Sequence, residues 1–419
     1  MDKEQLLKMY AALKNNPGEI VKAAARHRLI NFARYMQPDL ALEPFHVVYY
    51  TLLDKFAHGE IKKMIVQMPP QHGKSEGSSR KLPAFMLGLN PDTKICIGSY
   101  AATIARDFNR DVQRIIDTPK YREIFPKTFL NGSNVVTMAN TYLRNSDVIE
   151  MVGHKGSLRV VGRGGALTSK TVDVMIMDDV YKDYSEGNSP IVRNAAWKWY
   201  TTVVKKRLHN KSQELIVFTR WHEEDLIGKI EKGGEKIIDI KSWDSIKNIP
   251  DGAWVRINFE ALKTGEPNEI DPREPGAALW ESMHSRVKLE RERALDPIQF
   301  QCLDQGNPGS AEGRLYRNPF RTYVDKSEWG TFVRSGNYTD VADEGDDFTF
   351  SACYDVYKSG NEAWNEQKKR FEPILYALIT DMVFTQENTE VTAVTVPEMI
   401  NCCGTQKAWI ESNNGGAGF

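Results

Sequence analysis

The sequence lacks an excess of charge of either sign. Its 419 residues include 55 basic and 56 acidic side chains, which gives a formal net charge of −1. Without an overall cationic field, contact with a nucleic acid has to come from local basic patches. The composition therefore excludes a protein whose whole surface attracts polyanions, and functional sites have to be sought in local motifs.

Cysteine is scarce, and long apolar runs are missing. Five cysteines form no CxxC pair and no even disulfide framework, which suits a reducing compartment and predicts no zinc site: Cys96, Cys302, Cys353, Cys402 and Cys403. The charged N-terminus has no signal-peptide core, and no apolar run approaches the ~20 residues that span a bilayer. We expect a soluble intracellular protein that has no membrane contact.

The spacing of apolar residues predicts two domains of the α/β class. Residues 1–60 read as helices, with apolar positions three and four residues apart, for example through 45–56. A strand–helix alternation follows, which is typical of a parallel sheet with crossover helices. The expected core strands are 64–67, 94–97, 158–161, 172–177 and 215–218.

Stretches rich in glycine and proline indicate the domain boundaries in the remainder of the chain. A first domain is expected over 61–304, and its last part, about 229–304, looks irregular and is expected to form a linker subdomain. Residues 305–332 read as an interdomain linker, and a second α/β unit is expected over 333–419. Its expected elements are strands at 337–340, 348–356, 374–381 and 408–411, an acidic turn at 343–347 and a helix at 394–401.

The strongest single motif is MIVQMPPQHGKSE, in which an apolar strand leads into a tight loop and then a helical pattern. This arrangement is typical of a phosphate-binding loop, although Met68 stands where the consensus has its first glycine. Backbone N–H groups would face the phosphates of ATP, Lys74 would neutralise the β and γ groups, and Ser75 would ligate Mg²⁺. The residues expected to hold the nucleotide are Pro70, Gln71, His72, Gly73, Lys74, Ser75 and Glu76.

Two further apolar strands end in residues that suit nucleotide chemistry. The segment VDVMIMDD has the pattern of a Walker B strand, in which Asp178 would hold Mg²⁺ and Asp179 would activate the attacking water. In LIVFTRWHEEDL, Thr219 becomes a candidate γ-phosphate sensor if its strand lies between the other two. The alternatives are a buried strand capped by solvated acids and an exposed strand-to-helix turn. Because ligands of open α/β sheets bind beyond the carboxyl ends of the strands, we expect one active site at that edge.

Five segments, in this order, resemble large terminase subunits of tailed bacteriophages and prophages. They are PPQHGKSE, GSYAATIARDFNRDVQRII, GRGGALTSKTVDVMIMDDVYKD, FTRWHEEDLIG and WIESNNGGAGF, and the similarity extends over about 45–419. The resemblance implies a P-loop NTPase fold of the ASCE type that pumps double-stranded DNA into a procapsid, followed by a partial RNase H-like nuclease domain that cuts concatemers. It also implies a portal protein and a small terminase subunit as partners, the host cytoplasm as location, and a monomer that forms a ring on the portal.

The resemblance does not identify which arginine contacts the phosphates. Many relatives have arginine where this loop has Gln71, so a phosphate-facing cation is expected from elsewhere. Arg163, in GRGG before the Walker B strand, is our candidate for an arginine finger that reaches the nucleotide of a neighbouring subunit. The competing set is Arg106, Arg110 and Arg114, whose spacing puts them on one helix face, where a solvated stripe is the alternative.

Acidic residues at strand ends characterise the second unit. Asp340 and Glu411 each end an expected strand and Asp347 begins another, which suits a nuclease that uses two Mg²⁺ or Mn²⁺ ions. Asp340 and Glu411 match the first two acidic positions of the terminase nuclease, whereas Asp347 and Asp381 are weaker candidates. The RNase H-like pattern should continue past Glu411 with a helix, a strand and an acidic helix. We therefore expect the chain to hydrolyse ATP but to cleave DNA poorly.

Two other functions remain open from the sequence. A P-loop helicase or remodelling ATPase whose C-terminal unit only binds a partner would keep the nucleotide motifs without needing the acidic strand ends. A remnant prophage protein would not hydrolyse ATP at all. Loss of cleavage on substitution of Asp340 or Glu411 separates the nuclease from the first alternative, and an ATPase assay separates it from the second.

Overall fold

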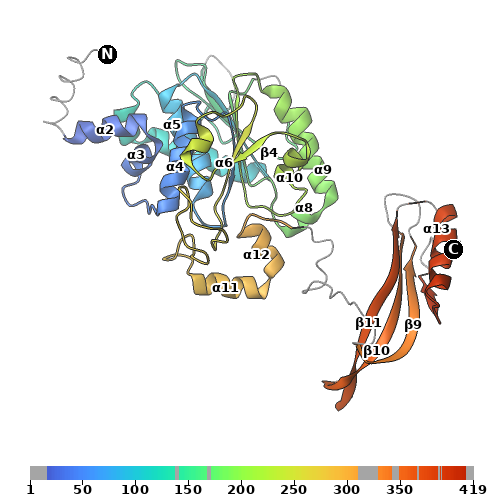
Figure 1. The fold of residues 1–419 in the computed structure, drawn as a ribbon. Helices are drawn as coiled ribbons and strands as arrows, with labels where there is room; N and C mark the ends of the chain where they lie inside the picture. Colours follow the sequence, from blue (N-terminus) through green and yellow to red (C-terminus); the bar gives the residue numbers. More distant parts are fainter. Residues whose placement is uncertain are drawn as a thin grey trace. The chain divides into compact units, whose positions relative to one another are not determined.

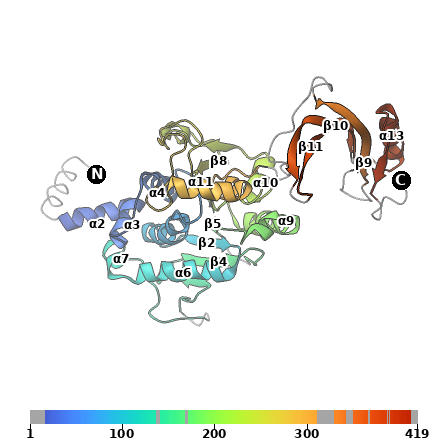
Figure 2. The same cartoon turned by 90° about the horizontal axis from the view of Figure 1, so that it is seen from below.

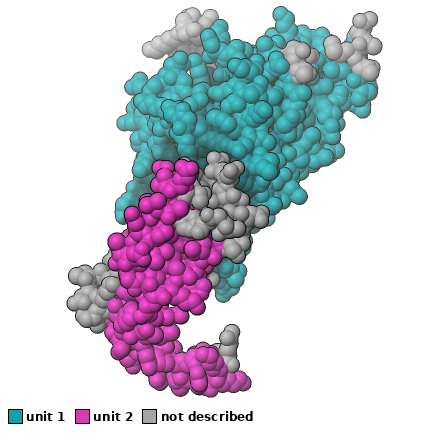
Figure 3. Space-filling view, turned by 90° about the vertical axis from the view of Figure 1, so that its right-hand side faces the viewer, with its two compact units in different colours: residues 1–315 teal, residues 316–419 magenta. Residues whose placement is uncertain are grey.

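The computed structural model describes residues 17–136, 141–167, 171–309, 329–341, 349–365, 368–385, 387 and 389–411. The chain divides into two compact units, residues 1–315 and 316–419, which are coloured separately in Figure 3. Among the described helices, none is long and apolar enough to cross a membrane.

The first unit is built on an eight-stranded sheet with the strand order β3-β4-β2-β5-β6-β1-β8-β7. Neighbouring strands are parallel throughout, except that β3 runs antiparallel to β4. The strands are β1 (Lys63–Gln67), β2 (Lys94–Ser99), β3 (Val148–Glu150), β4 (Ser157–Gly162), β5 (Val174–Asp178), β6 (Gln213–Val217), β7 (Ile237–Asp239) and β8 (Trp254–Asn258). All five core strands expected from the sequence are confirmed, with ends that differ by a few residues.

Helices cover both faces of this sheet, which explains why its strands are apolar at successive positions. Along β1, Met64 and Val66 pack into the core on one face, and Ile65 packs into the core on the other. In Figures 1 and 2, α4 and α6 lie on one side of the sheet and α9 and α10 on the other. The helices are α2 (Pro17–His27), α3 (Leu29–Met36), α4 (Pro44–Ala57), α5 (Leu82–Leu89), α6 (Ala102–Asp117), α7 (Pro119–Ile124), α8 (Tyr184–Asn188), α9 (Pro190–Trp199), α10 (Leu226–Lys232), α11 (Arg286–Leu295) and α12 (Pro297–Leu303). Shorter helical segments are π-helices at Glu76–Lys81 and Tyr200–Val204 and 3-10 turns at Lys205–Arg207 and Trp243–Ile246.

The segment 229–304, which was expected to be irregular, is partly regular. It contributes β7 and β8 to the main sheet, where β8 pairs directly with β1, and it contains α11 and α12. The expectation was wrong because β8 is short and carries the charged Arg256 between buried apolar residues. The strand that leads to the phosphate-binding loop therefore has a neighbour from this segment.

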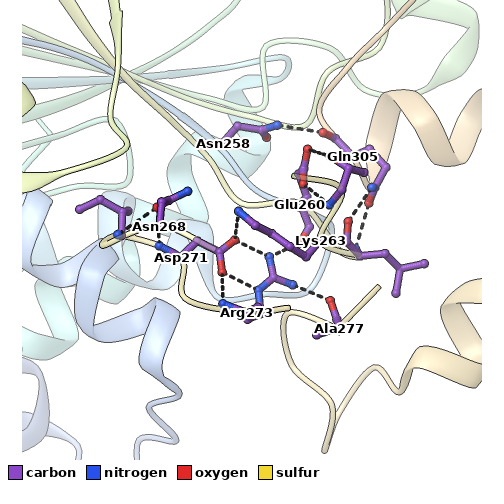
Figure 4. A network of polar contacts seen from close by, with 11 residues as sticks. Asn258, Glu260, Lys263, Asn268, Asp271, Arg273, Ala277 and Gln305 are labelled. Carbon is purple, nitrogen blue, oxygen red and sulfur yellow. Dashed lines mark hydrogen bonds and ion pairs between the residues drawn. The ribbon is translucent and has the colours of Figure 1, made fainter. Parts of the chain in front are cut away.

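A polar network holds the chain that follows β8 (Figure 4). Arg273 Nη2 donates to the Glu260 carbonyl at 2.9 Å, and Arg273 Nη1 donates to the Ala277 carbonyl at 3.0 Å. Asp271 accepts from Arg273 and also lies 3.3 Å from Lys263 Nζ. Buried charges are stable only when they are paired and hydrogen-bonded in this way. The network stabilises the segment between β8 and α11, which contains little regular secondary structure.

The second unit contains a four-stranded sheet with the strand order β11-β10-β9-β12. The strands β9 (Thr331–Asp340), β10 (Thr349–Asn365) and β11 (Arg370–Thr385) are antiparallel, and β12 (Ala408–Ile410) is parallel to β9. Helix α13 (Thr389–Cys402) precedes β12 and buries Val396 and Met399. The expected order of three strands, a helix and a strand is confirmed; the acidic turn at 343–347 lies outside the described residues.

Candidate functional site

The loop between β1 and the following helix contains two residues with left-handed backbone conformations. Gln71 and Gly73 both have left-handed backbone angles, with φ of 60° and 81°. A side chain at residue 73 would also come within 3.3 Å of the His46 ring. Glycine is therefore needed there both for its conformation and for the space, as the phosphate-loop motif predicts.

Two side chains of helix α4 bind two carbonyl groups of this loop. Tyr49 Oη donates to the Lys74 carbonyl at 2.5 Å. His46 Nε2 lies 3.2 Å from the His72 carbonyl, and because His46 Nδ1 accepts from the Glu43 amide, Nε2 is the protonated nitrogen. Because these two loop carbonyls are bound by α4, the amides at the start of the next helix can face an anion.

Lys74 reaches across the ends of two other strands. Its ammonium donates to Thr219 Oγ1 at 3.0 Å and lies 3.5 Å from Asp179 Oδ2. Thr219 follows β6, which lies between β1 and β5 in the sheet, so the strand placement expected for a γ-phosphate sensor is confirmed. The three strand-end motifs meet at one edge.

Asp178, the last residue of β5, is completely buried beside the loop. Ser75 Oγ donates to its Oδ1 at 3.1 Å, and Ser79 Oγ donates to its Oδ2. Burial, together with the charge of Asp179, raises the pKa of the Asp178 carboxyl to about 7. A cation beside this carboxylate would favour its ionised form, so Ser75 and Asp178 suit Mg²⁺ by position and by chemistry.

Ser79 is a functional candidate that the sequence reasoning missed. It lies in the π-helical segment Glu76–Lys81, four residues after Ser75, and it is fully buried. Such wide turns are frequent at functional sites. The available signal was the hydroxyl run Ser75, Ser78 and Ser79 directly after the loop, of which only Ser75 belongs to the familiar motif.

Asp179 has a backbone conformation that is rare for a residue other than glycine, with φ of 46°. Its carbonyl accepts from the Tyr100 amide at 2.9 Å and from Ser99 Oγ at 3.2 Å. Its amide donates to the Val217 carbonyl at 3.1 Å. These contacts from β2 and β6 hold the turn in which the carboxylate of Asp179 faces Lys74.

The arginine candidates are all engaged by neighbouring groups. Arg163 Nη1 donates to the Val180 carbonyl at 2.7 Å and to Glu186 Oε2 at 2.9 Å. On α6, Arg106 pairs with Asp147 and Arg114 with Asp111, both at 2.7 Å, and Arg110 pairs with Asp107. A trans-acting finger stays a prediction for Arg163, and the α6 set is an ion-paired surface stripe.

A cluster of neutral histidines flanks the loop. His72 is almost fully buried and stacks on His284, with ring centroids 4.5 Å apart. Burial lowers the pKa of His72 to about 4, and His72 Nδ1 lies 2.7 Å from the Pro70 carbonyl. His284 precedes α11, so this stack ties the loop to the segment that follows β8. Motif reading missed it because the two histidines lie far apart in the sequence.

In the second unit, Asp340 and Glu411 lie on the same face of neighbouring strands. Glu411 follows β12, its amide donates to the Thr339 carbonyl at 2.9 Å, and its Oε2 accepts from Tyr338 Oη at 2.9 Å. Tyr338 and Asp340 are two residues apart on β9 and so share a face. The arrangement places two carboxylates and one phenol on the same face of β9 and β12.

The other two acidic candidates are not part of this pair. Asp381 is opposite Cys353, which is opposite Asn337, and residue 337 faces away from Tyr338 and Asp340. Asp381 therefore lies on the other face of the sheet. Asp347 lies outside the described residues. Within the described parts of the chain, no group of three or more His, Cys, Asp or Glu residues could hold a metal ion.

Comparison with known proteins gives one family and several solved structures. Residues 65–316 match the family model described as terminase large subunit, T4likevirus-type, N-terminal. The large terminase of bacteriophage HK97 is 11% identical, with 92% of this chain and 74% of that chain covered and a TM-score of 0.42. The ATPase domain of the large terminase of Thermus phage P74-26 is 15% identical over 66% of this chain and 97% of that chain, with a TM-score of 0.40. The large terminase of a thermophilic bacteriophage, in complex with ADP, is 9% identical over 86% and 76%, with a TM-score of 0.30. No curated protein matches.

Proposed function

This chain belongs to the terminase large-subunit family, and on that premise we propose that it is a viral DNA-packaging motor subunit that hydrolyses ATP to move double-stranded DNA into a procapsid. One observation carries the proposal. Lys74, Asp179 and Thr219, which come from three separate strand ends, meet within hydrogen-bond or ion-pair distance. A buried carboxylate, Asp178, lies beside them with two serine hydroxyls.

Each group has a distinct task in this proposal. Lys74 binds the β and γ phosphates, and the amides of the loop and helix start bind the same oxygens. Mg²⁺, held by Ser75 and Asp178, would supply positive charge against the phosphate oxygens when it is bound. Asp179 accepts a proton from the attacking water, and the hydroxyl of Thr219 contacts the γ-phosphate. Because Thr219 and Asp179 both contact Lys74 in this structure, loss of the γ-phosphate can be transmitted to two strand ends.

The partners follow from the family and are part of the proposal. We infer that the chain acts in the host cytoplasm, where it binds double-stranded DNA, a portal protein and a small terminase subunit. It is expected to be a monomer in solution and a ring on the portal.

The proposal is tested by the ATPase activity of Lys74→Ala, measured with DNA and procapsids present. We expect kcat to fall about 10²- to 10³-fold, because a charge aimed at the developing transition state is removed. Lys247→Ala is a matched control, since Lys247 is an exposed lysine that pairs with Asp244. Wild-type activity in Lys74→Ala would show that the nucleotide chemistry lies elsewhere.

A second activity is proposed for the second unit. We infer that Asp340 and Glu411 bind one or both divalent cations of a DNA-cutting nuclease, with Mg²⁺ or Mn²⁺ as the metal. The proposal is supported by their position on one face of two adjacent parallel strands, with Tyr338 bound to Glu411. Asp347 remains a further candidate ligand from the sequence alone.

Metal binding and cleavage are measured separately for this proposal. Asp340→Ala and Glu411→Ala should each weaken Mn²⁺ binding at least tenfold by calorimetry and abolish any Mn²⁺-dependent nicking of plasmid. Asp381→Ala is the matched control, since it removes a carboxylate from the opposite face of the same sheet. Equal loss in all three variants would mean that the face of the sheet does not matter, and the assignment would fail.

A further inference from the structure

Arg163 is placed where it can control the turn after the Walker B strand. It follows β4, and its amide donates to the Ser99 carbonyl at 2.7 Å, so the turn after β4 is attached to the end of β2. Its guanidinium then extends to the Val180 carbonyl at 2.7 Å and to Glu186 at 2.9 Å. One side chain therefore connects β4, the turn after β5 and helix α8.

The turn that Arg163 holds is the one that directs Asp179. A left-handed conformation at a residue with a side chain costs about 1–2 kcal/mol, so the surrounding contacts have to maintain it. Ser99 and Tyr100 bind the carbonyl of Asp179, and Arg163 binds the next carbonyl, that of Val180. Consecutive carbonyl groups of the turn are thus fixed, and the Asp179 carboxylate is left facing Lys74 at 3.5 Å.

The guanidinium of Arg163 is also held on its other side. Its side chain is only 14% exposed, and it lies over the Tyr181 ring at 5.8 Å. Glu186 is fixed in turn, because its carboxylate accepts from the Lys182 amide at 2.9 Å. Burial acts to raise the pKa of Glu186, but the hydrogen bonds from Arg163 and from the Lys182 amide, together with the charge of Arg163, lower it overall, so the carboxylate is charged at neutral pH. An arginine that serves a neighbouring subunit has to project from the surface, and this one does not.

We propose that Arg163 acts within its own subunit as a positioning residue: it fixes the turn that carries Asp179, and Glu186 holds it in place. The inference rests on the proposed ATPase function and changes the role of one residue in it. The cation that stabilises the transition state from another subunit then has to be a different residue. Arg163 contributes to kcat through the direction of Asp179, without contact with the nucleotide.

The experiment uses the full chain with DNA and procapsids and compares Arg163→Ala, Arg163→Lys and Glu186→Gln. Arg163→Ala should lower kcat about 10- to 100-fold while KM for ATP changes less than about threefold, because binding groups are untouched. Arg163→Lys should recover part of the loss, since an ammonium can still donate to the Val180 carbonyl. Glu186→Gln should lower kcat by a smaller factor, and the Arg163→Ala/Glu186→Gln pair should be no worse than Arg163→Ala alone.

A mixing assay separates the two roles of the arginine. If Arg163 acted on a neighbour, rings assembled from Arg163→Ala and Lys74→Ala subunits would regain hydrolysis, since each intact site could receive the arginine of the other subunit. We expect no recovery. Recovery, or an unchanged kcat in both Arg163→Ala and Arg163→Lys, would overturn the inference. Failure of the wild type to hydrolyse ATP would overturn the proposed function, and this inference with it.

A control distinguishes positioning from general stabilisation. Arg144 is similarly buried, at 19% side-chain exposure, and pairs with Asp117 away from the loop. Arg144→Ala should lower the melting temperature and leave kcat within about twofold. If Arg144→Ala and Arg163→Ala reduced kcat equally, the effect of Arg163 would be one of stability only, and the positioning role would be wrong.

Discussion

The two units place carboxylates at the ends of strands in opposite environments. In the first unit, Asp178 is fully buried and receives hydroxyl groups on both oxygens. In the second, Asp340 and Glu411 are exposed, and the Tyr338 hydroxyl donates to Glu411. Buried groups are held in place by the protein before any ligand arrives, whereas exposed carboxylates depend on the ligand for their geometry. Single substitutions should therefore cost more in the first unit than in the second.

The largest effect is expected at Asp179, next to the buried carboxylate. Asp179→Asn keeps the size of the side chain but removes the base, so kcat for ATP hydrolysis should fall about 10³-fold with KM changed only a few-fold. The measurement is steady-state hydrolysis with DNA and procapsids. Asp251→Asn is the control, because Asp251 is almost fully exposed and pairs with Lys62 at the surface. A loss below tenfold in Asp179→Asn would assign the base to another group.

A pH effect should follow from the histidines beside the loop. The pKa of His72 is about 4 in the folded chain and about 6.5 unfolded, so above pH 6.5 both states are neutral. As the pH falls below 6.5, only the unfolded chain takes up the proton, and stability is lost. At pH 5 the cost is about 2 kcal/mol, at about 1.4 kcal/mol per pKa unit.

His72→Gln tests this effect, because it removes the titrating ring. The charged or titratable groups that face it are His46, His284 and Lys74, all of which oppose a positive charge there. Thermal unfolding of the wild type and of His72→Gln at pH 7 and pH 5 should show a smaller acid loss in the variant. Equal losses in both proteins would mean that His72 takes up its proton in the folded state.

Some contacts of the candidate site could be predicted from the sequence, because they follow from the general architecture of a parallel sheet. The meeting of Lys74, Asp178 and Thr219 could be predicted, because carboxyl ends of parallel strands share an edge whatever the details of packing. The strand order that puts Thr219 between the other two was the only condition, and it holds. Family resemblance added the order of the motifs and not their geometry.

Contacts that depend on packing between distant segments could not be predicted. The bond from Ser79 to Asp178 requires a wide helical turn, and the stack of His72 on His284 requires α11 to lie against the loop. The position of Asp381 on the opposite face follows from strand register, which a list of acidic strand ends does not contain. Arg163 was identified as important from its motif, but its partner Glu186 comes from a different element.

A smaller effect is expected on substitution of Ser79, because Asp178 then loses the hydrogen bond from Ser79 but keeps the one from Ser75. Ser79→Ala should raise the Mg²⁺ concentration for half-maximal hydrolysis about tenfold, as changes in groups around metal ligands do. Because the Ser79 hydroxyl lowers the pKa of Asp178, its removal should also move the acid limb of the kcat profile to higher pH. Ser78→Ala is the control, since Ser78 Oγ donates to the Lys74 carbonyl and contacts Ser79 Oγ at 3.3 Å, whereas Asp178 accepts from Ser79. If the two variants behaved alike, the Ser79 bond would have no specific role.

The smallest effect is expected in the second unit, at Tyr338. Tyr338→Phe removes one hydrogen bond to Glu411 and leaves the ring, and because the bond is exposed to water, Mn²⁺ affinity should fall only about threefold. Glu411 itself raises the pKa of Tyr338, so the phenol stays protonated and donates throughout the neutral range. Calorimetric titration with Mn²⁺ measures the change, and Tyr357→Phe on β10, outside the pair, serves as control. A loss as large as that in Glu411→Ala would mean that the phenol organises the carboxylates as rigidly as the serines organise Asp178, and the contrast between the two units would disappear.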